Sequence, residues 1–214
     1  MSSAHLHAPW HRGLALLPAF LALVLAVGLA VGLTPSPGLG AVPEARANAF
    51  PDLALNLTPD SAKALDLPFG GPTRLSRLPA EALIVVLVSY FCPPCHKEVP
   101  RLKDLEQRLR ERSLTGRIRL LGLAPGDDQA QVERFLALHG GLPFPLVPDP
   151  DLAAHKRLGS PVVPSLYVVA SHGNRLRLLS LTQGEFTADP DAFLDAVLRA
   201  LPAPAGRGPA RRAP

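Results

Sequence analysis

Two cysteines, Cys92 and Cys95, are the residues of this chain whose type and spacing most directly indicate chemistry. They are the only cysteines in the 214 residues, and two prolines separate them. A disulfide between residues so close in sequence closes a loop too short to restrict the unfolded chain much, so it would add little stability. Two thiols at this spacing can instead form and break a disulfide reversibly, and the sequence therefore indicates thiol-disulfide exchange.

The residues on either side of the pair predict a buried strand followed by a long helix. Residues 83–88 are continuously apolar and mostly β-branched, which is typical of a strand buried on both faces. Residues 93–112 place apolar side chains at the spacing of one helical face. A cysteine at a helix N-terminus faces unpaired amide hydrogens, so we expect the pKa of Cys92 to lie below that of free cysteine. Cys92 would then attack a substrate disulfide, and Cys95, one turn along the same face, would release the product.

The rest of the chain alternates predicted strands and helices. Further strands are predicted at residues 53–57, 73–78, 118–124, 143–147, 166–170 and 176–181, and further helices at residues 129–139, 151–158 and 189–201. The first two of these strands are expected to form a hairpin, and His172-Gly173-Asn174 marks a second one. This order of elements predicts an α/β sandwich with a mixed sheet.

An apolar segment precedes the predicted domain. Residues 14–33 contain no charged side chain, and at about 1.5 Å per residue a helix of this length would cross the hydrocarbon core of a bilayer. Two interpretations stay open: an uncleaved membrane anchor, which the length favours, and a signal peptide cleaved near Ala45-Arg46-Ala47. Both predict export. An anchor would form a single span in a bacterial inner membrane with the domain in the periplasm or outside, whereas a cleaved signal peptide would lead to secretion.

These features divide the chain into three parts. We expect residues 1–47 to be the anchor or signal segment with a linker, and residues 48–201 to be one domain. Residues 202–214, rich in Pro, Ala and Arg, are expected to be disordered. The net charge is +4, but acidic and basic side chains balance at 17 each between residues 48 and 201. The excess positive charge therefore lies at the ends, and no nucleic-acid partner is expected.

The segment around the cysteines is similar to the active site of a known family. Residues 88–100, VSYFCPPCHKEVP, resemble the thioredoxin-like reductases that include the cytochrome c maturation proteins and the TlpA and ResA type. The likeness extends over residues 50–201, because residues 48–53 resemble the family's opening and Val163-Pro164-Ser165 resembles its cis-proline loop. The resemblance implies a thioredoxin-like three-layer sandwich with a mixed central sheet, an N-terminal hairpin and a central βα insertion.

The resemblance also implies roles for residues beside the cysteines. Pro164 would be the cis-proline, with Pro161 the weaker candidate, and the Val163 backbone would pair with bound substrate like an added strand. Phe91 stands where the family usually has tryptophan and is expected to contribute to the substrate-binding surface. Glu98 matches the family's acidic residue three positions after the second cysteine.

Glu98 has two possible roles on the predicted helix. It shares the helical face of Cys95 and could accept its proton, or it could be a solvated first-turn carboxylate favoured by the helix dipole. Val86 stands where thioredoxin itself has a buried aspartate, which gives Glu98 more weight as the proton acceptor. His96 is a candidate to hold the Cys92 thiolate, although a solvent-facing helix position is the favoured interpretation.

The leading functional prediction is a protein disulfide reductase or oxidoreductase acting on exported proteins, with apocytochrome c as a candidate substrate. A thiol-disulfide electron donor in the membrane would recharge it. The Cys92–Cys95 disulfide is itself the redox group, so no further cofactor and no metal ligand are predicted.

A copper or haem chaperone, a zinc protein and a thiol peroxidase are the alternatives to a reductase. A copper or haem chaperone using the reduced dithiol stays open, because soft sulfur ligands suit Cu(I). Zinc is disfavoured, since there is no second cysteine pair and the histidines lack ligand spacing. A thiol peroxidase is disfavoured because Ser89 stands three residues before Cys92, where such enzymes usually have threonine, and Val85 replaces an expected proline.

Overall fold

The computed structural model describes residues 48–201. The predicted anchor at residues 14–33 and the predicted disordered tail at residues 202–214 lie outside the described residues. Between residues 48 and 201, no helix combines the length and the apolar character that a membrane crossing requires.

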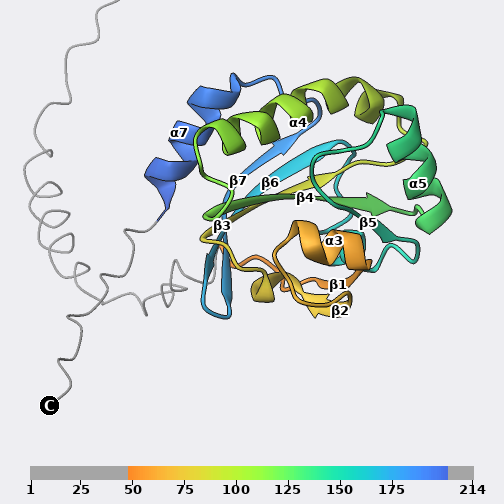
Figure 1. The fold of residues 1–214 in the computed structure, drawn as a ribbon, viewed down its shortest axis with the longest axis horizontal. Coiled ribbons are helices and arrows are strands. Elements are labelled where there is room, and N and C mark those ends of the chain that lie inside the picture. Colours follow the sequence, from red (N-terminus) through yellow and green to blue (C-terminus); the bar gives the residue numbers. More distant parts are fainter. Residues whose placement is uncertain (1–47, 202–214) are drawn as a thin grey trace, which may run out of the picture. The chain divides into compact units, whose positions relative to one another are not determined.

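The described residues form the elements labelled in Figure 1. The strands are β1 (Ala54–Leu57), β2 (Gly71–Arg74), β3 (Ala82–Leu87), β4 (Ile118–Pro125), β5 (Leu146–Asp149), β6 (Ser165–His172) and β7 (Arg175–Gln183). The helices are α3 (Pro59–Ala64), α4 (Pro93–Glu111), α5 (Gln129–Leu138), α6 (Ala153–Arg157) and α7 (Pro190–Ala200), with a 3-10 turn at Leu75–Arg77.

Five strands form the central sheet in the order β5-β4-β3-β6-β7. The pairs β3·β4 and β4·β5 are parallel, whereas β6 runs antiparallel to both β3 and β7. At the start of the domain, residues 48–50 add a short antiparallel bridge to the edge strand β7. The predicted mixed sheet is confirmed, and α5 and β5 form the predicted insertion between β4 and β6.

Both faces of the sheet are covered, which gives the predicted three layers. In Figure 1, α4 and α7 lie on one side of the sheet, and α3, β1 and β2 lie on the other. Successive side chains of a strand point to opposite faces, so Ile84 and Val86 of β3 join the core beneath α4, while Leu83 and Val85 join the core against β1. This double burial explains why β3 is apolar at every position.

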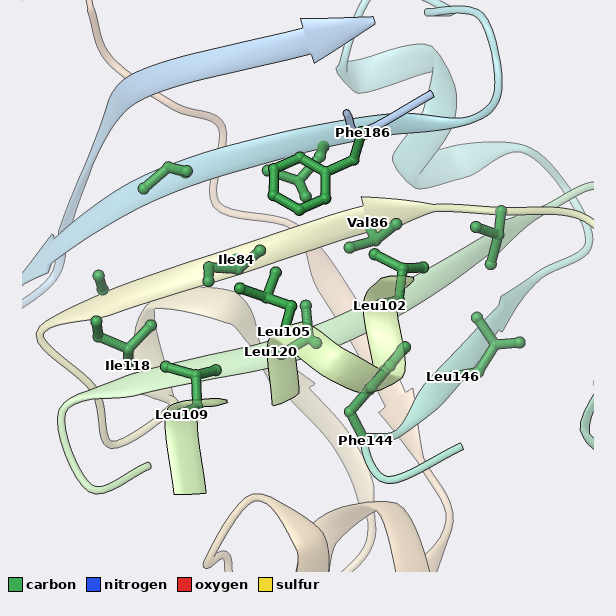
Figure 2. Close-up of a cluster of buried hydrophobic side chains, with 14 of the residues drawn as sticks. Ile84, Val86, Leu102, Leu105, Leu109, Ile118, Leu120, Phe144, Leu146 and Phe186 are labelled. Carbon is green, nitrogen blue, oxygen red and sulfur yellow. The ribbon is translucent and has the colours of Figure 1, made fainter. Parts of the chain in front are cut away.

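Figure 2 shows the core between α4 and the sheet. Cys92 and Cys95 belong to the same buried cluster. Leu102, Leu105 and Leu109 of α4 are fully buried and belong to one cluster with Ile84 and Val86. Burying a leucine side chain fully contributes about 1.5–3 kcal/mol. The packing holds α4 across β3, and the short loop between them places the start of the helix at the carboxyl end of the strand.

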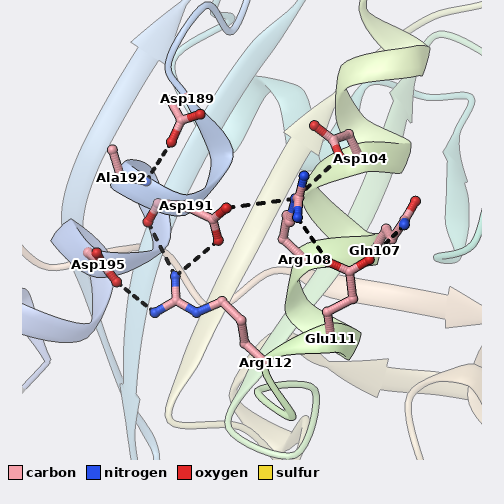
Figure 3. Close-up of polar contacts among 9 residues, drawn as sticks. All are labelled: Asp104, Gln107, Arg108, Glu111, Arg112, Asp189, Asp191, Ala192 and Asp195. Atoms are coloured by element: carbon pink, nitrogen blue, oxygen red, sulfur yellow. Dashed lines mark hydrogen bonds and ion pairs between the residues drawn. The ribbon is translucent and has the colours of Figure 1, made fainter.

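Ion pairs join α4 to α7 on the outer surface of this layer, as Figure 3 shows. Arg112 lies 2.6 Å from an Asp195 carboxylate oxygen and 3.5 Å from one of Asp191, and Arg108 lies 3.7 Å from the other Asp191 oxygen. All four side chains are partly exposed, so solvent screens each pair and its contribution to stability is small. Their main effect is to fix how the two helices lie against each other.

Two predicted strands differ from the structure. The expected hairpin contains α3 between its strands, because Thr58 caps this helix by accepting the Ser61 amide at 3.1 Å and Pro59 begins it. Its second strand ends at Arg74, and the chain then turns as a 3-10 helix. The strand predicted at 143–147 lies instead at Leu146–Asp149, an edge position that tolerates its proline.

Candidate active site

Cys92 and Cys95 form a disulfide at the start of α4, with their Cα atoms 5.3 Å apart. Cys92 is the N-cap residue, just after the loop that leaves β3, and Cys95 lies in the first turn. Cys92 is 9% exposed, whereas Cys95 is 0% exposed. An attacking sulfur must approach in line with the bond that it breaks, so the Cys92 sulfur is the one that an external thiol or disulfide can reach.

The backbone of the first turn of α4 stabilises a negative charge on the Cys92 sulfur. The Cys95 amide donates to Cys92 Sγ at 3.3 Å. Pro93 and Pro94 carry no N–H, so the Cys95 amide is the first one in the helix that can donate. Such a bond strengthens when the acceptor is a thiolate, and the same contact therefore favours ionised Cys92 once the disulfide is reduced.

The loop before β6 lies against the disulfide. The Val163–Pro164 peptide bond is cis, and the Val163 carbonyl oxygen is 3.6 Å from Cys92 Sγ. The Ser165 hydroxyl donates to the Val162 carbonyl at 2.6 Å, and the His155 ring bonds the Pro161 carbonyl at 2.8 Å. These bonds hold Val163 and Pro164 beside the cysteines, where the family resemblance implied that they would lie.

Two exposed apolar side chains lie on the segments that contact the disulfide. Phe91, directly before Cys92, is 68% exposed, and Val162, two residues before the cis-proline, is 61% exposed. The Phe91 ring meets the Tyr90 ring edge-on at 5.0 Å between centroids, which orients it. Exposed apolar groups beside a reactive bond fit a site that receives the surface of another protein.

Glu98 is a buried carboxyl group. It is 4% exposed, its Oε1 accepts the Phe186 amide at 2.8 Å, and its Oε2 is buried without a hydrogen-bond partner among the described residues. Burial raises the pKa of Glu98, although the Phe186 hydrogen bond opposes this shift. Of the two sequence interpretations, the solvated carboxylate is therefore wrong. The raised pKa makes the Glu98 carboxylate a better proton acceptor than an ordinary glutamate.

The raised pKa of Glu98 predicts a pH-dependent effect of Glu98→Gln on stability. The folded protein binds the Glu98 proton more tightly than the unfolded chain does. The free energy of unfolding of the wild type therefore falls as the pH rises through the pKa of folded Glu98, which lies above 4.5. Glutamine cannot ionise, so the variant should gain stability relative to wild type as the pH rises from 4.5 through the raised pKa of folded Glu98. Urea unfolding of both proteins at several pH values measures the difference, and a difference that stays constant contradicts the shift.

The loop before Cys92 contacts Asp127, which sequence reasoning did not connect with the site, and His96, which it did. The buried Asp127 carboxylate accepts from the Ser89 hydroxyl at 3.1 Å and from the Tyr90 amide at 2.6 Å. The His96 ring bonds the Tyr90 carbonyl at 2.7 Å and the His139 ring at 2.8 Å. His96 is half-buried on α4, and its two ring nitrogens bond the Tyr90 carbonyl and His139 rather than the Cys92 sulfur.

One signal in the sequence could have placed Asp127 near the cysteines. It follows Gly126 at the end of β4, which runs parallel to β3, and the carboxyl ends of parallel strands meet at one edge of a sheet. No comparable signal existed for His139. Between residues 48 and 201, no three His, Cys, Asp or Glu side chains gather as a metal site would require.

The fold and this site together define a thioredoxin-like protein, with a disulfide at the start of the helix that follows the central strand and a cis-proline loop beside it. Residues 47–174 match the family model described as the AhpC/TSA family, and the chain belongs to that family. The predicted thioredoxin-like membership is thereby confirmed.

The chain is also similar to individual known proteins, at low sequence identity. The chain is 23% identical over 109 residues to the thiol-disulfide oxidoreductase ResA of Halalkalibacterium halodurans, an alignment that spans 51% of this chain and 59% of that protein. A Chlorobium tepidum structure described as a thiol:disulfide interchange protein DsbE has a TM-score of 0.55 and 19% identity, covering 72% of this chain and 96% of that one. The structure of StoA from Bacillus subtilis has a TM-score of 0.50 and 17% identity, and the match covers 68% of this chain and 96% of that one. The structural matches confirm the fold.

Proposed function

We propose that this protein is a thiol-disulfide oxidoreductase that reduces disulfides in exported proteins through Cys92-Pro93-Pro94-Cys95. The observation that carries the proposal is the disulfide between a reachable Cys92 and a fully buried Cys95 at the N-terminus of α4. The similarity to ResA, which is named a thiol-disulfide oxidoreductase, supports the same activity here.

The reaction transfers two electrons from the reduced pair to the substrate. The Cys92 thiolate attacks one sulfur of the substrate disulfide, which breaks that bond and releases the other sulfur as a thiolate. Cys95 loses its proton and attacks Cys92 Sγ, which releases the second substrate sulfur and leaves the Cys92–Cys95 disulfide. Glu98 takes up the Cys95 proton, and the two substrate thiolates take protons to become thiols.

The substrate lies along the cis-proline loop in this proposal. The Val163 backbone pairs with an extended segment of substrate, and Phe91 packs against its apolar side chains. Such contacts bind backbone and apolar surface rather than one particular sequence, so they fit unfolded protein substrates. Apocytochrome c is a candidate of this kind.

Export and recharging complete the proposal. The apolar residues 14–33 would anchor the chain in a bacterial inner membrane, or direct its secretion if cleaved, with the domain on the oxidising side. On that side the Cys92–Cys95 disulfide needs an external source of electrons. A thiol-disulfide protein in the membrane would supply them by the same exchange chemistry.

Insulin reduction tests the activity. The reduced wild-type protein should accelerate insulin precipitation by dithiothreitol, and Cys92→Ser should lower the rate to the uncatalysed background, because serine cannot form the mixed disulfide. Phe69→Ser is a matched surface control, since Phe69 is exposed in the loop between α3 and β2 and should leave the rate unchanged. Equal activity of Cys92→Ser and wild type contradicts the proposal.

Two further measurements separate the reductase from its alternatives. A reduction potential near that of thioredoxin, about −270 mV, is expected for a reductase, whereas a value near about −120 mV belongs to strong periplasmic oxidants. Metal analysis of protein purified under reducing conditions tests the chaperone alternative. Stoichiometric copper with no insulin activity would favour that alternative over a reductase.

A further inference from the structure

We propose that Asp127 and His96 are positioning residues that hold the Tyr90 backbone from two sides and so keep the Cys92 sulfur within reach of Cys95. This inference rests on the proposed exchange reaction and adds residues outside the Cys-Pro-Pro-Cys segment to its machinery. We call the set of bonds from Asp127 and His96 to Tyr90 the Tyr90 clamp.

Asp127 forms one side of the clamp. Its Oδ2 accepts the Tyr90 amide at 2.6 Å and its Oδ1 accepts the Ser89 hydroxyl at 3.1 Å, so each carboxylate oxygen has a donor in the loop. Asp127 is 1% exposed, which keeps water from competing for these bonds. A hydrogen bond to a charged acceptor contributes more than a neutral one, and the short Tyr90 contact is of this charge-assisted kind.

His96 forms the other side. A carbonyl oxygen only accepts hydrogen bonds, so the 2.7 Å contact requires a hydrogen on His96 Nε2 that points at the Tyr90 carbonyl. In the neutral ring His96 Nδ1 then accepts, and the 2.8 Å contact with His139 Nε2 supplies the donor. Phe135 packs against the His96 ring at 4.9 Å between centroids. His139 and Phe135 thus orient the His96 ring toward Tyr90.

Burial and the neighbouring groups favour neutral His139. Burial lowers the pKa of His139, and so do the neighbouring His96 and Lys103, whose ammonium donates to the His139 carbonyl at 2.5 Å. One added proton can also be accommodated, because a charged His96 donates through both nitrogens while His139 accepts. His96 Nε2 carries a hydrogen that points at the Tyr90 carbonyl whether the histidine pair is neutral or has gained one proton. The clamp therefore persists when the pair is protonated once.

The clamp matters because Cys92 lies outside the regular helix. The chain turns between Ser89 and Cys92, with the Cys92 amide bonded to the Ser89 carbonyl at 3.1 Å, and Tyr90 is in the middle of that turn. With both Tyr90 backbone groups bonded to side chains from other segments, the turn cannot rotate. A freed turn would let Cys92 Sγ leave its place beside Cys95, and the effective concentration of one thiol at the other would fall.

The reduction potential tests the clamp, measured by equilibrating the Cys92–Cys95 pair with dithiothreitol or glutathione buffers. Asp127→Ala and His96→Leu should each lower the disulfide-forming equilibrium constant about tenfold, which is about 30 mV toward more positive potential. Asp127→Asn retains an acceptor for the Tyr90 amide, and His96→Gln retains a donor for the Tyr90 carbonyl. Each should restore the disulfide-forming equilibrium constant to within about threefold of wild type.

Matched controls separate positioning from general destabilisation. Asp151→Ala and His172→Leu make the same chemical changes at exposed sites outside the clamp, and should leave the potential unchanged. His139→Leu removes the bond that orients His96 without altering the turn, and should shift the constant about threefold, so it remains informative if the buried substitutions prevent folding. Potentials of folded Asp127→Ala, His96→Leu and His139→Leu equal to wild type would overturn the proposal.

Failure of the clamp and failure of the proposed function give different results in this experiment. It uses small thiols and no protein substrate, so a protein that fails to reduce insulin can still show the shifts. An active insulin reductase with unshifted variants would leave the function standing and remove the clamp.

Discussion

Reduced Cys95→Ala protein should accumulate as a covalent mixed disulfide with its substrate, joined through Cys92. Cys92 can still attack in this variant, because Cys92 is the less buried of the two cysteines. The amide of residue 95, which donates to Cys92 Sγ at 3.3 Å, belongs to the backbone and is retained by the substitution. The intramolecular nucleophile that completes the reaction is lost. Effective molarities of well-oriented groups reach about 10⁵ M or more, so turnover should fall by at least about 1000-fold. Non-reducing electrophoresis and peptide mapping measure the adduct.

The reciprocal variant is the control for this prediction. Cys92→Ala leaves Cys95 as the single thiol, and Cys95 is 0% exposed in the native fold. It should therefore form little adduct with folded or unfolded protein disulfides. Equal trapping by the two variants would show that the cysteines are not divided into an attacking and a resolving residue.

Glu98→Gln should slow the second chemical step about 100-fold, within the range of general acid-base catalysis. Glu98 shares a helical face with Cys95, and its buried Oε2 has no hydrogen-bond partner among the described residues. Because burial raises the pKa of Glu98, the wild-type step should accelerate as the pH rises through that pKa, where the carboxylate becomes able to accept a proton. The glutamine variant should lack this acceleration. Single-turnover decay of the mixed disulfide measures the rate.

Glu106→Gln provides the matched control on the same helix. Glu106 is also buried, and burial also raises its pKa, but it lies two turns further along α4, about 12 Å away, and pairs with Arg110. Its substitution should alter stability and leave the decay rate unchanged. A Glu98→Gln protein that resolves the mixed disulfide at the wild-type rate would remove Glu98 from the mechanism.

Local pattern was enough to predict most of the elements. The continuous apolar run of β3 and the helical spacing after Cys92 each depend on burial of a periodic face, and periodicity is a property of neighbouring residues. The errors came where a local signal was short. Thr58 and Pro59 begin a helix of six residues. The strand expected at 143–147 begins three positions later and ends two positions later, because pairing with β4 sets its bounds.

The chemistry of the site was readable from the sequence only in part. The positions of Cys92 and Cys95 in one helical turn follow from spacing, and the cis-proline loop followed from the family resemblance. The sequence left two environments open for Glu98. Burial depends on what covers a helix face, and the Phe186 amide that contacts Glu98 comes from 88 residues further along the chain.

By itself, the sequence determined that two thiols would meet at the start of a helix after a buried strand, because that arrangement depends only on residues within about one turn of each other. Only the tertiary structure decided which cysteine is the less buried, that Glu98 is buried, and that Asp127 and the His96–His139 pair hold the Tyr90 loop. These contacts join residues 37, 38 and 43 positions apart. They exist because β3 and β4 end at one edge of the sheet while α5 returns beside α4, and no local pattern encodes such a meeting.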